Sequence, residues 1–141
     1  MNENPSRLKI LVYFLIFSVL SGLSYQMIQD RMRPGLSAEA PEWLVYALGV
    51  APNFLGGVSL AAGFIVVARE LVEMNDRRLS DLMATGLATA SLVLWEILQI
   101  WLPNGFFDAH DIFWTFPGAA LAFIAARSML GAPAPNRDVG A

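Results

Sequence analysis

The 141-residue chain contains no cysteine and a single histidine, His110. The absence of thiols excludes disulfides, thiolate zinc sites and cysteine catalysis. Charged residues are also scarce: they make up 15% of the chain, against roughly 25% in soluble domains. The net charge is −3 and the basic residues form no patch, so no nucleic acid is expected as a partner. Hydrophobic residues make up 56% of the chain, which indicates a surface that meets lipid.

Four apolar segments meet or approach the ~20 residues that a membrane-spanning helix needs. They are Leu8–Ile28, Trp43–Ala68, Leu82–Leu102 and Ile112–Leu130. We therefore predict an all-α fold, a four-helix transmembrane bundle over residues 1–130, with no room for a second domain. Residues 131–141 are small and proline-containing, and we expect them to form a disordered C-terminal tail.

The first segment has a second interpretation. Arg7 and Lys9 precede an apolar run, as in a secretory signal peptide. However, the run continues past Tyr25 to Met27 and Ile28 and lacks a clear A-x-A site. These two features favour a helix that is retained in the mature protein.

The distribution of lysine and arginine predicts the orientation. Seven of the nine basic residues fall on one side of the predicted topology, and the linker Pro103–Asp111 has none. By the positive-inside rule, both termini and the linker Arg69–Asp81 are cytoplasmic. The linkers Gln29–Glu42 and Pro103–Asp111 then lie outside. We expect a solvated loop where charges of both signs gather in the inner linker, at Arg69, Glu70, Glu73, Asp76, Arg77 and Arg78.

Two local features bear on packing. Pro52 removes a backbone donor, which predicts a kink or short break in the second helix, with Asn53 able to satisfy a freed carbonyl. Small residues recur at four-residue spacing and predict close helix packing within the bundle, with a helix partner or with a second copy of the chain. The clearest series are Gly57 with Ala61, and Gly118 with Ala122 and Ala126.

Glu96 is an ionisable residue inside a predicted span, where a charge costs at least ~2.5 kcal/mol. Gln99 follows on the same helical face. Two interpretations remain open. Glu96 could hydrogen-bond across helices to Asn53 or Gln99, or it could line a polar pocket that opens outward and admits a headgroup.

The nearby linker carries Asp108, His110 and Asp111. We expect Asp111 to be the N-cap of the last helix, and Asp108 to cap the preceding turn. Carboxylates with a histidine could hold a divalent cation, but capping already accounts for the aspartates. No nucleophile accompanies Glu96. We therefore predict no metal site, no cofactor and no catalytic residue.

The stretch Glu96–Gly118, EILQIWLPNGFFDAHDIFWTFPG, resembles the VanZ-like family of small bacterial membrane proteins. The family's pattern runs E-x-x-Q, then proline, arginine and D-x-x-D, then asparagine and glycine. Two positions depart from it: Gly105 stands where arginine is usual, and Thr115 where asparagine is usual. The matching residues are Glu96, Gln99, Pro103, Asp108, Asp111 and Gly118.

The resemblance implies a protein of the bacterial inner membrane, in a family named for a protein linked to teicoplanin resistance, with no reaction established for the family as a whole. It leads us to expect an outward-facing polar site for an envelope lipid or glycopeptide-type ligand. A glycine at position 105 cannot clamp an anionic headgroup as arginine would. The alternative is an accessory subunit of a larger membrane complex, without chemistry of its own. The candidate ligand-binding residues are Glu96, Gln99, Asp108, Asp111, Asn53 and Thr115.

Overall fold

The computed structural model describes residues 7–72, 74, 76–103 and 107–131, and these residues form helices and connections without a strand. Four helical stretches are long and apolar enough to cross a membrane, as the sequence predicts. They are Arg7–Met32, Glu42–Leu71, Arg77–Trp101 and Ala109–Leu130. The predicted tail falls almost wholly outside the described residues.

The first stretch, called the first span below, joins α-helical and π-helical pieces. It consists of α1 (Arg7–Tyr13), η1 (Phe14–Leu20), α2 (Ser21–Met27) and η2 (Ile28–Met32). Then come α3 (Glu42–Leu71), α4 (Arg77–Leu98) with the 3₁₀ turn η3 (Gln99–Trp101), and α5 (Ala109–Leu130). The first span is part of the packed bundle, because the Tyr13 side chain is fully buried and its hydroxyl donates to the Ala122 carbonyl oxygen at 2.8 Å.

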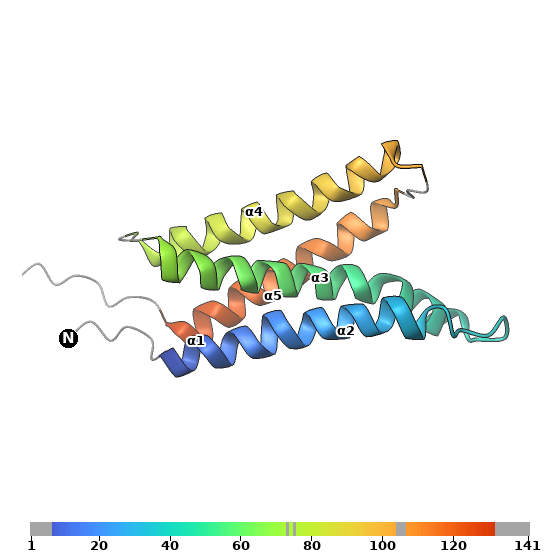
Figure 1. Ribbon diagram of the computed structural model, residues 1–141, viewed down its shortest axis with the longest axis horizontal. Helices are drawn as coiled ribbons and strands as arrows, with labels where there is room; N and C mark the ends of the chain where they lie inside the picture. The colour runs from blue at the N-terminus through green and yellow to red at the C-terminus, as the bar shows by residue number, and fades with distance from the viewer. Residues whose placement is uncertain (1–6, 73, 75, 104–106, 132–141) are drawn as a thin grey trace, which may run out of the picture.

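α3 is the central helix of the bundle (Figure 1). It packs most extensively on α5 and also contacts α4 and the first span. α4 and the first span lie on opposite sides of α3, and no packed interface joins them along the described residues. We call the end where α1 begins and α5 ends the termini end, and the opposite end, where α3 and α5 begin, the loop end.

The crossing of α3 and α5 depends on two glycines. A Cβ atom on Gly57 would lie 2.5 Å from the Thr115 carbonyl oxygen, and one on Gly118 would collide with the Phe54 carbonyl oxygen. The helix backbones therefore touch, as the small-residue spacing predicts. Buried alanines continue this interface toward the termini end: Ala61, Ala62, Ala119, Ala122 and Ala126.

A buried ion pair joins α3 to α4 at the termini end. Arg69 Nε donates to Asp81 Oδ1 at 2.8 Å, and Arg69 Nη2 donates to Asp81 Oδ2 at 2.6 Å. The two side chains are only 4% and 0% exposed. A third Arg69 nitrogen reaches the Leu130 carbonyl oxygen at 3.5 Å, and Arg127 Nη1 lies 4.0 Å from Asp81. One carboxylate thus connects three helices.

This pair corrects part of the prediction of a solvated loop at Arg69–Asp81, because Arg69 and Asp81 are buried. Arg69 lies in the last turn of α3, and α4 already begins at Arg77 with Asp76 as its N-cap. Arg69 continues the buried face that Ala61 and Ile65 begin, one helical turn apart each time. The bundle therefore extends past the apolar segment to include the paired Arg69 and Asp81, whereas Glu70, Asp76 and Arg78 are exposed.

Of the kink or short break predicted at Pro52, the break does not occur. α3 continues through this residue, which is buried between neighbouring helices. Pro52 lacks the backbone N–H that a helix normally uses, but α3 packs on α5 and on the first span. Such tertiary contacts can override the low helix propensity of a single residue. α5 likewise continues through Pro117.

We expect Gly118→Ala to destabilise the bundle by about 1–3 kcal/mol, because the methyl group forces α3 and α5 apart. Gly86→Ala is the matched control: a Cβ atom there meets nothing within 4 Å, so this change should be neutral or stabilising by up to about 1 kcal/mol. Unfolding by denaturing detergent in mixed micelles measures both. Equal stability of the two variants would contradict the backbone contact.

We expect Asp81→Ala to destabilise the bundle by about 3–5 kcal/mol, because it leaves the Arg69 guanidinium buried without its carboxylate. The double variant Arg69→Leu with Asp81→Leu should recover a large part of this loss. The same unfolding assay tests the cycle. Additive losses in the double variant would show that the two side chains are not coupled.

Candidate functional site

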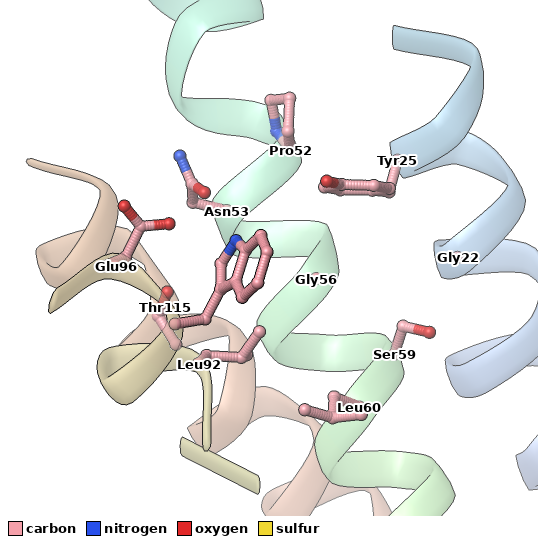
Figure 2. A pocket seen from close by; sticks show the side chains of 11 residues that line it. Gly22, Tyr25, Pro52, Asn53, Gly56, Ser59, Leu60, Leu92, Glu96 and Thr115 are labelled. Atoms are coloured by element: carbon pink, nitrogen blue, oxygen red, sulfur yellow. The ribbon is translucent and has the colours of Figure 1, made fainter. Parts of the chain in front are cut away.

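A pocket of about 290 Å³ lies in the loop-end half of the bundle (Figure 2). The first span, α3, α4 and α5 all contribute to it, and α3 forms its floor between the first span and α4. Its lining residues are Gly22, Tyr25, Pro52, Asn53, Gly56, Ser59, Leu60, Leu92, Trp95, Glu96 and Thr115.

Glu96 carries the only carboxyl group among the lining residues, and it is 8% exposed. It lies on the buried face of α4, which also carries Asp81, Ala84 and Ala88. Gln99 Nε2 donates to Glu96 Oε2 at 2.8 Å. No other hydrogen bond and no ion pair joins Glu96 to a described residue, so its second oxygen remains available. The bond to Gln99 lies within one helical stretch, so the predicted hydrogen bond across helices is not found among the described residues, whereas Glu96 does line a pocket.

The pocket is polar at one end and apolar at the other. Glu96, Asn53 and Tyr25 lie toward its loop-end side, and Leu60 and Leu92 lie deeper (Figure 2). Neither the Asn53 amide nor the Tyr25 hydroxyl makes a hydrogen bond to a described residue. These groups are available to a ligand, in the arrangement that an amphiphile with a polar head and an apolar chain requires.

Two hydroxyl groups of the lining are already satisfied. Ser59 Oγ donates to the Ser18 carbonyl oxygen at 2.8 Å, and Thr115 Oγ1 donates to the Asp111 carbonyl oxygen at 2.9 Å. The first bond holds the first span against α3. The second leaves the Thr115 oxygen able to accept a further bond.

The structure brings together four of the six predicted site residues. Glu96, Asn53 and Thr115 line the pocket, and Gln99 is bonded to Glu96. Asp108 and Asp111 do not line it.

The cap of α5 is Asp108, so the predicted N-cap role of Asp111 is wrong. Asp108 has an extended backbone, and its carboxylate accepts from the His110 backbone nitrogen at 2.8 Å. Asp111 lies within the first helical turn instead. The His110 backbone N–H holds the pKa of Asp108 below its usual value, and the His110 side chain adds to this effect.

Tyr25 and Trp95 also line the pocket, although no motif marks either residue. The only signal is position: Trp95 precedes Glu96, and Tyr25 carries a hydroxyl inside an apolar run. Among the described residues, no group of three or more His, Cys, Asp or Glu side chains is arranged to hold a metal ion. The available chemistry is hydrogen bonding, one carboxyl group and two aromatic rings.

The four spanning helices define a multi-pass membrane protein. Comparison with protein-family models, curated proteins and solved structures finds no match to this chain.

Proposed function

We propose that this protein binds an amphiphilic molecule of the bacterial envelope, a lipid or a glycopeptide-type ligand, in the pocket beside Glu96. The observation that carries the proposal is a buried carboxyl group that faces a 290 Å³ pocket and has no basic partner among the described residues. Ionisable residues at membrane depth pair with another group or mark a site of function. The resemblance of Glu96–Gly118 to the VanZ-like pattern supports the same assignment, since Glu96 and Gln99 are matched positions.

A ligand would enter from the side. The first span and α4 flank the pocket without packing on each other, so lipid can approach between them over α3. The acyl chain would lie along Leu60 and Leu92, and the headgroup would reach Glu96, Asn53 and Tyr25. No large movement of the helices is needed.

The pocket would open to the outer leaflet of the inner membrane, with both termini cytoplasmic. The positive-inside rule supports this orientation, because seven of the nine basic residues belong to the termini end or to the segments next to it.

Cysteine labelling tests the orientation, and the cysteine-free chain gives no background. Ser37→Cys lies in the exposed connection before α3, and Glu70→Cys lies at the exposed termini end of α3. We expect a membrane-impermeant maleimide to label Ser37→Cys in intact cells, and Glu70→Cys only after permeabilisation. The reverse pattern would place the pocket in the cytoplasmic leaflet.

Lipid retention tests the binding function. The wild-type protein, purified in mild detergent, should carry a bound amphiphile that mass spectrometry of the extract identifies. Glu96→Ala should reduce its amount about tenfold, since hydrogen bonds to a charged group contribute ~1.5–3 kcal/mol. Glu70→Ala, which removes an exposed carboxylate at the other end of the bundle, is the control and should retain the amphiphile.

Equal retention by wild type and Glu96→Ala would contradict the proposal. A stoichiometric integral partner that copurifies in place of a lipid would favour the alternative, an accessory subunit of a membrane complex.

A further inference from the structure

We infer that the headgroup recognised in the pocket carries a cationic amine, which sits against Glu96. This inference rests on the proposed function and names the chemical class of its ligand. It follows from the contrast between the two carboxylates on the buried face of α4.

Asp81 and Glu96 lie on the same face of α4, near its opposite ends. Asp81 is compensated within the protein by two bonds from Arg69 and by the nearby Arg127. Among the described residues, Glu96 has only the neutral amide of Gln99 as a hydrogen-bond partner. A carboxylate between apolar helices is stabilised by a positive charge within a few ångströms. Glu96 instead lines the open volume of the pocket, where no lysine or arginine is among the lining residues.

The charge around the pocket argues against an anionic headgroup. No lysine or arginine is among the lining residues. Asp108 and Asp111 act electrostatically on Glu96, whereas Arg33 acts on Asp111. A phosphate placed beside Glu96 would be repelled by it and would find no cation there. The phosphate of a zwitterionic lipid would have to lie outside the pocket, toward the aqueous surface.

The lining matches the needs of an ammonium group, which has three donors and no acceptor. The free oxygen of Glu96, the side-chain oxygen of Asn53 and the hydroxyl oxygen of Thr115 supply three acceptors, and their side chains gather on one side of the pocket (Figure 2). The rings of Tyr25 and Trp95 complete the lining, and aromatic faces attract cations. A neutral hydroxyl could use the same acceptors, but it would leave the carboxylate charge uncompensated.

Binding of matched lipids to the full-length chain tests this inference. The probes are dioleoyl phosphatidylethanolamine, its N-acetyl derivative and dioleoyl phosphatidylglycerol, which share their acyl chains and phosphate but differ in the amine. Native mass spectrometry from detergent micelles gives the affinity of each. We expect the ethanolamine lipid to bind about tenfold more tightly than the other two, since a charge-assisted bond exceeds a neutral one by about 1.4 kcal/mol or more.

Glu96→Gln keeps an acceptor oxygen and the shape of the side chain but removes the charge. It should abolish the preference, so that the ethanolamine lipid and its N-acetyl derivative bind equally. Glu70→Gln removes an exposed carboxylate at the termini end and should keep the preference. Retention of the preference in Glu96→Gln would overturn the inference.

The wild-type measurement is decisive even if Glu96→Gln does not fold. Equal affinity for the ethanolamine lipid and its N-acetyl derivative would overturn the inference and leave the proposed function standing, as would tighter binding of phosphatidylglycerol. If the wild-type chain binds none of the three probes and also retains no amphiphile on purification, both the inference and the proposed function are overturned. If it binds none of the three probes but retains another amphiphile, only the inference is overturned.

Discussion

A carboxylate held between apolar helices needs a compensating partner, and α4 presents two such groups on one buried face. At the termini end the protein itself supplies the positive charge, because Arg69 donates two hydrogen bonds to Asp81 and Arg127 lies beside Asp81. At the loop end, Gln99 is the one hydrogen-bond partner that the described part of the chain offers to Glu96. The same physical requirement is thus met by a buried ion pair at one end of α4, whereas at the other end the carboxyl group faces a pocket.

The pocket exists because of how closely α3 and α5 approach. Gly57 and Gly118 bring the two backbones into contact, with the Thr115 carbonyl against Gly57 and the Phe54 carbonyl against Gly118. This crossing places Thr115 of α5 close to Asn53 of α3, on the side where Glu96 approaches from α4 (Figure 2). A larger residue at either glycine would separate the helices and disperse the acceptors, so packing and the site depend on the same contact.

Much of the fold could be predicted from the sequence. An apolar run of about 20 residues has few interpretations other than a membrane-spanning helix. Glu96 could also be chosen as a candidate site residue from the sequence, because an ionisable side chain inside an apolar run stands out whichever face of the helix it lies on. The ion pair between Arg69 and Asp81 could not be predicted from the sequence. Both residues lie at the ends of apolar segments, where charged side chains are usually exposed to water. The recurring spacing of Ala61, Ile65 and Arg69 is a signal in hindsight, yet it does not identify the partner.

The remaining misses have the same origin in register and packing. The cap of α5 differs from the expected residue by three positions because both aspartates suit an N-cap, and only the extended backbone at Asp108 selects it. Pro52 could not be judged without knowing that helices on both sides support α3. Tyr25 enters the pocket through the rotation of the first span about its axis, which an apolar run without periodicity does not specify.

The first span forms the wall of the pocket that lies opposite α4. Ser59 bonds to the Ser18 carbonyl oxygen, and a Cβ atom on Gly22 would approach Ser59 Oγ to 2.9 Å, so the first span lies close to α3 at this level. Toward the loop end, the Tyr25 ring lies against Gly56 of α3 and lines the pocket. A chain from which this helix had been removed as a signal peptide would lose Gly22 and Tyr25, and Glu96 would face lipid across an open groove. The second wall of the pocket therefore depends on the first span, which supplies Gly22 and Tyr25.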